Sequence, residues 1–76
     1  MTANEYEEFR ELISIGEELN FYYQGEEYWI SHTPGKSYLT RSKDSYSQEF
    51  SGHEQLFEQG MIDGRLMGEL FEELVW

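Results

Sequence analysis

The absence of cysteine constrains the fold of this 76-residue chain more than any other feature. No disulfide can reinforce the structure, and the only two histidines, His32 and His53, are too few for a structural zinc site. A chain of this length forms one core, which rarely leaves more than about 3–5 kcal/mol of net stability. Aromatic side chains make up 17% of the residues and must supply much of the buried area. We therefore expect one globular domain over residues 1–76.

The charge of the chain excludes several classes of partner. Its net charge is −11, from 16 acidic and five basic residues. Such a surface repels a nucleic-acid backbone and an anionic membrane, so we expect direct binding to neither. No apolar run is long enough to span a bilayer, and the first residues lack the basic-then-apolar pattern of a secretory signal. The sequence predicts a cytoplasmic protein.

Residues 4–15 have the pattern of an amphipathic helix. Thr2 and Glu5 fit a capping box at its start, and Asn4 and Glu7 fit the same pattern two residues later. Apolar residues recur at spacings of three and four, which predicts one buried stripe. Its members are Tyr6, Phe9, Leu12 and Ile13.

A β-hairpin is predicted over residues 19–30, where apolar and polar residues alternate. We expect its turn at residues 24–27, with Gly25 and Glu26 as a two-residue type II′ loop. That loop would place Glu26 and Glu27 in the solvated turn. It would also set Phe21 opposite Ile30, and Tyr22 opposite Trp29.

Two further strands extend the predicted sheet. The segment from Thr33 to Lys36 reads as a turn because of its Pro-Gly pair. A strand over residues 37–41 would point Leu39 inward, and a strand over residues 46–50 would point Tyr46 and Phe50 inward.

The remaining residues predict two helices. A capping-box pattern from Ser51 to Glu54 opens a short helix that ends at Gly60, and Asp63 would cap a last helix. The last helix would bury the stripe formed by Leu66, Met67, Leu70, Phe71 and Leu74. The predicted order is α-β-β-β-(β)-α-α, an α+β fold in which a three- to four-stranded antiparallel meander carries the helices on one face.

No catalytic residues, metal ligands or cofactor-binding residues are predicted. The sequence has no nucleotide-binding glycine loop, no nucleophile elbow and no zinc-protease motif. We expect His32 to be a partly buried structural residue at the edge of the core. His53 and Glu54 are adjacent in a helix, so their side chains diverge and do not form a metal pair. We expect a protein that is not an enzyme.

Aromatic residues on the outer face of the sheet are the first candidate binding feature. If Phe21 and Ile30 point inward, then Tyr22, Trp29 and Tyr38 point outward. Exposed aromatic clusters are typical of interface hot spots. Two alternatives are that these residues only stiffen the sheet through cross-strand pairs, or that a helix covers this face.

Rows of carboxylates are the second candidate binding feature. They are Glu5, Glu8 and Glu11 on the first helix and Glu69, Glu72 and Glu73 on the last. Such rows resemble the charge density of a phosphate backbone, so a DNA mimic of this kind could occupy the basic groove of a nucleic-acid enzyme. The alternative is a hydrated surface that only confers solubility.

A resemblance adds a biological setting. Three segments carry it: Tyr6-Glu7-Glu8-Phe9, the hairpin from Phe21 to Trp29, and Met61-Ile62-Asp63-Gly64 followed by Leu70 and Trp76. In these segments the chain resembles the short acidic proteins of unassigned function found in low-GC Gram-positive bacteria and their phages. The resemblance implies an anti-defence inhibitor, such as an anti-CRISPR protein, or a toxin immunity protein.

The sequence therefore predicts an inhibitor that binds a larger protein with a basic surface, such as a nuclease, a CRISPR effector or a toxin. The alternative is a structural module that forms a homodimer through its aromatic face, with no inhibitory role.

Overall fold

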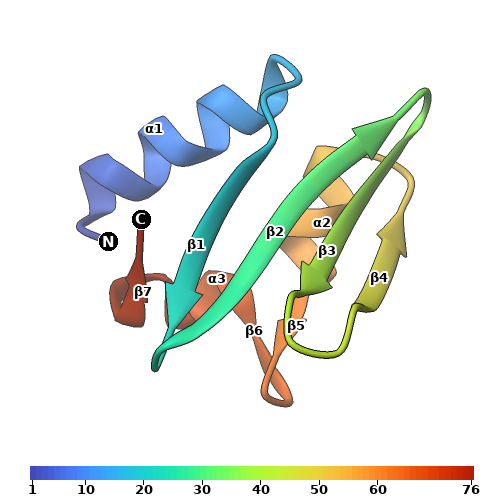
Figure 1. The fold of residues 1–76 in the computed structure, drawn as a ribbon. Coiled ribbons are helices and arrows are strands. Elements are labelled where there is room, and N and C mark those ends of the chain that lie inside the picture. Colours follow the sequence, from blue (N-terminus) through green and yellow to red (C-terminus); the bar gives the residue numbers. More distant parts are fainter.

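A five-stranded antiparallel sheet forms one layer of the molecule, and the helices form the other (Figure 1). The computed structural model describes residues 1–76. The elements are α1 (Ala3–Ser14), β1 (Leu19–Tyr23), β2 (Glu26–Thr33), β3 (Lys36–Arg41), β4 (Tyr46–Phe50), α2 (His53–Gln59), β5 (Met61–Ile62), β6 (Arg65–Leu66), α3 (Met67–Leu70), the 3-10 turn η1 (Phe71–Glu73) and β7 (Leu74–Val75). The predicted α+β class and the four-stranded meander are confirmed.

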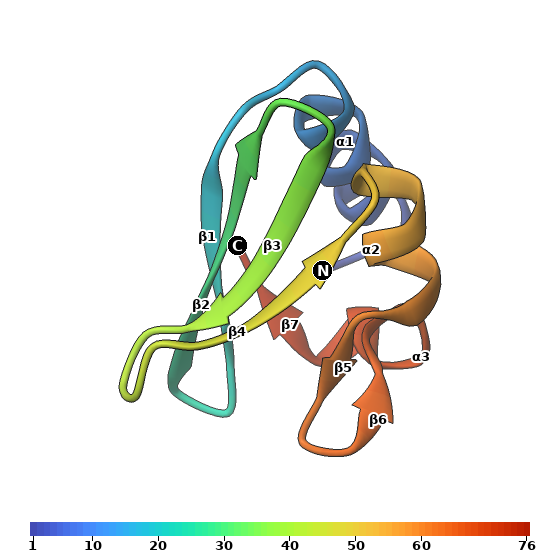
Figure 2. The same cartoon turned by 90° about the vertical axis from the view of Figure 1, so that its right-hand side faces the viewer.

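The strand order in the sheet is β4-β3-β2-β1-β7. The first four strands follow the chain as a meander, and β7 returns from the C-terminus to pair with β1, Val75 opposite Tyr22. Figure 2 shows all the helices on one side of the sheet, as the sequence predicted.

The register of the β1–β2 hairpin differs from the prediction. Gln24 and Gly25 form the two-residue loop, both with positive φ angles of 50° and 80°, the pattern of a type I′ turn. The predicted loop lay one residue later in the chain, so the register moves by two residues. Phe21 therefore lies opposite Tyr28 and not Ile30. A shift of two residues leaves every side chain on its predicted face.

Helix α1 begins as predicted and α2 does not. Of the two capping patterns at α1, the one that forms uses Thr2 and Glu5, each side chain bonding the other's backbone N–H. Helix α2 begins after Gly52, so Gln55, not Glu54, occupies the third helical position. The Gln55 Oε1 accepts a hydrogen bond from the Ser51 N–H at 2.7 Å. The predicted capping box from Ser51 to Glu54 is therefore wrong.

The C-terminal segment departs furthest from the prediction. Asp63 does not cap a helix, because Asp63 and Gly64 form the positive-φ loop of a small hairpin between β5 and β6. The last helix is only the four residues of α3, followed by η1 and β7. Leu74 still points into the core, but from a strand.

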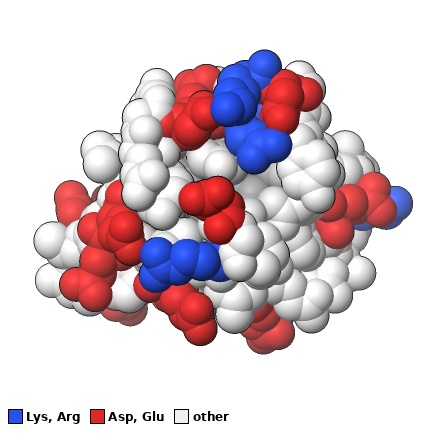
Figure 3. Space-filling view, turned by 90° about the horizontal axis from the view of Figure 1, so that it is seen from below, with Lys and Arg blue, Asp and Glu red and all other residues white.

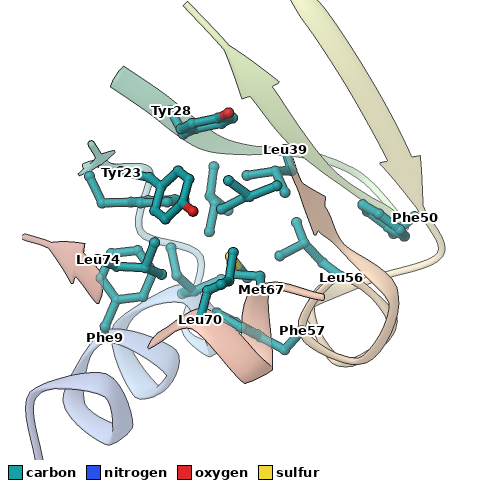
Figure 4. Packing of buried hydrophobic residues seen from close by; sticks show 14 residues of the cluster. Phe9, Tyr23, Tyr28, Leu39, Phe50, Leu56, Phe57, Met67, Leu70 and Leu74 are labelled. Carbon is teal, nitrogen blue, oxygen red and sulfur yellow. The ribbon is translucent and has the colours of Figure 1, made fainter. Parts of the chain in front are cut away.

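The core lies between the sheet and the helices (Figure 4). Phe21, Ile30 and Leu39 of the sheet are fully buried, as predicted, and Phe50 is buried at the edge. Tyr46 was predicted to be inward, but its side chain is 58% exposed. The Arg41 guanidinium lies over the Tyr46 ring, 5.5 Å from the ring centroid. Tyr46 is exposed because no helix covers this part of the sheet.

The two ends of the chain lie close together, beside α1 (Figure 1). The Met1 amino group donates to the carbonyl oxygens of Phe71 and Leu74. Trp76 packs edge-on against Phe9, with 5.1 Å between ring centroids.

Candidate functional site

The outer face of the sheet carries the predicted aromatic residues and is open. Tyr22 and Trp29 are 41% and 42% exposed, and Tyr38 is partly buried. The helices lie on the opposite side (Figure 2), so the alternative that a helix covers this face is excluded. The predicted orientation of these three side chains is confirmed.

The aromatic residues form a diagonal row across the three strands β1, β2 and β3. Tyr22 pairs with Glu27, and Trp29 pairs with Asn20, so Tyr22 and Trp29 are diagonal neighbours. The prediction that they lie directly opposite each other is wrong. Tyr38 is diagonal to Trp29 on the other side, since Trp29 pairs with Thr40. Val75, opposite Tyr22 and 64% exposed, extends the row onto β7. We call Val75, Tyr22, Trp29 and Tyr38 the outer band.

Glu27 lies beside the outer band and has no basic partner. It was predicted to lie in the turn, but Glu26 and Glu27 are the first residues of β2. The Glu27 side chain points to the outer face, where its Oε2 accepts the Asn20 amide at 2.9 Å and the Tyr22 hydroxyl at 3.4 Å. Hydrogen bonding from Asn20 is the main reason that the pKa of Glu27 lies below its usual value.

The six predicted carboxylates lie in the helix layer, on α1, α3 and η1, and those of η1 directly precede β7, which carries Val75 of the outer band. Glu5 is engaged in the α1 capping box, and Glu73 pairs with Arg65 at 3.6 Å. The remaining four are exposed and have no ion pair: Glu8, Glu11, Glu69 and Glu72. The carboxylates of α1 therefore lie on the opposite side of the sheet from the aromatic residues of the outer band (Figure 2), whereas those of η1 lie next to its Val75 end.

Nearly all of the basic residues are neutralised by carboxylates of the same chain. Three of the pairs fall in or beside the β3–β4 hairpin: Lys36–Glu49 at 3.1 Å, Arg41–Asp44 at 2.6 Å and Lys43–Glu26 at 2.9 Å. Figure 3 shows the same pattern, since the basic groups on that face lie against acidic ones. Arg10 is the exception, with its guanidinium over the rings of Tyr6 and Phe57.

The histidines have structural surroundings. His32 is partly buried, as predicted, and both of its ring nitrogens are hydrogen bonded: Nδ1 to the Ser37 hydroxyl at 2.8 Å and Nε2 to the Glu17 carbonyl at 3.1 Å. Nowhere do three metal-ligating side chains gather. None of the helices combines the length and apolar character needed to cross a membrane.

A cleft of about 410 Å³ lies between the sheet and the β5–β6 hairpin, with Tyr28, Arg41, Tyr46 and Asp63 in its lining. The guanidinium of Arg41 donates two hydrogen bonds to the Asp44 carboxylate, at 3.0 and 2.6 Å. The only basic group of the cleft is therefore already paired, and Asp63 is its one charged side chain without an ion-pair partner.

Comparison of the chain with protein-family models, curated proteins and solved structures finds no match.

Sequence reasoning missed two members of this surface. Val75 was given no place in a predicted element, and Glu27 was assigned to a turn. The signal for Glu27 was its spacing of two from Trp29, which places both on one face of a strand that begins immediately after a two-residue loop.

Proposed function

We propose that this protein is a non-enzymatic, cytoplasmic binding protein that covers a basic surface on a larger protein and thereby inhibits it. The observation that carries the proposal is the outer band, an uncovered row of aromatic side chains beside a carboxylate that no basic residue of the chain neutralises. Aromatic residues of this kind dominate the binding energy of protein interfaces.

The charge distribution supports a basic partner. Only four of the 16 carboxylates have an ion-pair partner, and the basic side chains that could have met an acidic partner are already occupied. The unpaired carboxylates of the helix layer would add long-range attraction, which speeds encounter at low salt. A nuclease, a CRISPR effector or a toxin has the kind of basic groove that this surface would block.

A homodimer through the outer band is the competing function. Packing two copies face to face would bring both Glu27 carboxylates toward one apolar interface, where like charges oppose association. A protein of opposite charge meets no such penalty, so the structure favours a different partner.

The test combines affinity capture with a matched pair of variants. The immobilised protein is exposed to a lysate of its source organism at about 50 and about 300 mM salt, and the retained protein is identified, purified and titrated by calorimetry. We expect Trp29→Ala to cost about 2 kcal/mol or more of binding free energy. Ile15→Ala, which removes an exposed apolar side chain that is 72% accessible at the end of α1, should have no effect.

Sedimentation of the purified protein distinguishes the two functions. The proposal is supported if the protein is a monomer and the Trp29→Ala variant no longer binds the captured partner. A salt-resistant dimer that dissociates with Trp29→Ala supports the homodimer and overturns it, as does a partner whose affinity is the same for both variants.

A further inference from the structure

The Glu27 carboxylate is arranged to accept a ligand from outside the chain. The hydrogen bonds from the Asn20 amide and from the Tyr22 hydroxyl both end on Oε2. An ionised carboxylate can accept about four hydrogen bonds, and neither of these two ends on Oε1, although Ser42 and Trp29 also lie close enough to help lower the pKa of Glu27. No lysine or arginine of the chain lies within ion-pair distance of it.

Aromatic rings stand on two sides of this carboxylate. Tyr22 is directly opposite Glu27 on β1, where facing Cβ atoms lie about 5 Å apart. Trp29 is two residues further along β2 on the same face, about 7 Å away along the strand. A cation held by the Glu27 carboxylate would therefore have Tyr22 and Trp29 as neighbouring aromatic side chains on the same face, and cation–π contacts act over roughly 6 Å.

Arginine already binds a carboxylate beside an aromatic ring elsewhere in this molecule. Arg41 is held by the Asp44 carboxylate through two hydrogen bonds while its guanidinium lies 5.5 Å from the centre of the Tyr46 ring. Arg10 also lies over aromatic rings. The outer face offers the same pair of groups, a carboxylate and flanking rings, without the arginine.

We propose that Glu27, Tyr22 and Trp29 form a receptor for an arginine side chain on the basic partner protein. This inference rests on the proposed function and names the group that the outer band recognises. Asn20 and the Tyr22 hydroxyl fix the carboxylate in place, so little ordering is required when the arginine arrives. The lowered pKa of Glu27 keeps the carboxylate ionised at neutral pH.

Arginine fits this site better than lysine. The planar guanidinium can donate two parallel hydrogen bonds to a carboxylate and stack on an aromatic ring at the same time. It is also more weakly hydrated than an ammonium group, so it loses less on leaving water.

The test is an NMR titration that does not need the natural partner. The probes are a capped five-residue peptide with one central arginine and the matched peptide with a central lysine. Binding is followed through the indole N–H of Trp29 and the side-chain amide of Asn20. Trp76, which is 44% exposed and packs against Phe9 of α1, is an internal control.

We expect the arginine peptide to shift the Trp29 and Asn20 signals but not the Trp76 signal, with a dissociation constant of roughly millimolar size. The lysine peptide should bind several-fold more weakly. Glu27→Gln should weaken the arginine peptide about tenfold, because it removes the charge that strengthens the hydrogen bonds. Glu58→Gln, the same change on exposed α2, should have no effect.

Glu27→Gln retains an oxygen acceptor for Asn20, and an unchanged thermal midpoint would confirm that it folds normally. Equal affinity for the two peptides, or equal affinity of the wild type and Glu27→Gln for the arginine peptide, would overturn the inference.

The outcomes separate this inference from the proposed function. If binding of a captured partner depends on Trp29 but not on Glu27, and neither peptide binds, the proposed function is supported and the arginine receptor is refuted. If the protein binds the arginine peptide selectively and this binding depends on Glu27, but no captured partner requires Trp29, the receptor is supported and the proposed function is refuted.

Discussion

The side-chain amide of Gln48 brackets the backbone of Met61 with two hydrogen bonds. Its Nε2 donates to the Met61 carbonyl at 2.8 Å, and its Oε1 accepts the Met61 N–H at 2.9 Å. Gln48 thus acts as a strand partner that is one residue long, and it fastens the β5–β6 hairpin to the inner side of edge strand β4.

Replacing Gln48 should loosen this hairpin. Gln48→Ala removes both bonds, and we expect a loss of about 1–2 kcal/mol in the free energy of unfolding, measured in urea. Hydrogen exchange at the Met61 amide should accelerate. Gln59→Ala, at the exposed end of α2, is the control, and an unchanged Met61 exchange rate in Gln48→Ala would contradict this role.

Gly60 is required because of close packing and not because of its backbone angles. A Cβ at this position would lie 2.6 Å from the Leu56 carbonyl oxygen and 3.2 Å from Leu39 Cδ2. Gly60→Ala should therefore cost about 1–3 kcal/mol of stability.

Gly68→Ala is the matched control, since its Cβ would meet only the Phe57 carbonyl oxygen at 3.6 Å. It should be neutral or slightly stabilising, because alanine favours a helix more than glycine does. Thermal melting compares the two variants, and an equal effect would show that packing at Gly60 is not the cause.

Asp44 should titrate at unusually low pH. Hydrogen bonding from Arg41 lowers the pKa of Asp44 to about 2. Because its folded pKa lies below its unfolded value, the stabilisation is present above about pH 4 and is lost as pH falls toward 2. Carbon-detected NMR of the carboxyl groups gives the midpoint directly. A midpoint near the usual value of 3.8 would mean that the ion pair does not persist in solution.

The loop between β1 and β2 can be improved by design. Gln24 adopts a φ of 50°, which asparagine tolerates better than glutamine, and Asn-Gly is the preferred type I′ pair. Gln24→Asn should stabilise the protein by a few tenths of a kcal/mol, whereas Gly25→Ala, at a φ of 80°, should destabilise it by about 1 kcal/mol. Denaturant midpoints with unchanged slopes would check both effects.

The sequence predicted the sheet well because the faces of its strands depend only on alternation. Phe21, Ile30 and Leu39 are buried where the pattern placed them, although the register of the hairpin was wrong by two residues. The C-terminal segment was harder. Asp-Gly reads equally well as a helix start and as a hairpin loop, and a four-residue helix depends on tertiary packing and not on propensity.

The candidate site was predicted only in part, for the same reason. The outward orientation of Tyr22, Trp29 and Tyr38 followed from alternation. The neighbours of Glu27 depend on register, which was set by the loop type and not by any property of Glu27 itself. The sequence analysis treated the carboxylates of the helices as a separate feature, and in the fold those of α1 lie on the side of the sheet opposite the aromatic residues (Figure 2).

The bend at Gln24 and Gly25 has a consequence for how recognition could evolve. If this bend drifted by one position, β1 would slide past β2 by two residues and every core side chain would stay inside. Tyr22 would then stand next to Trp29, and Glu27 would move out into the bend. Mutations in the bend, at residues that are not themselves part of the contact area, could thus create or erase the preference for a ligand while leaving the architecture intact.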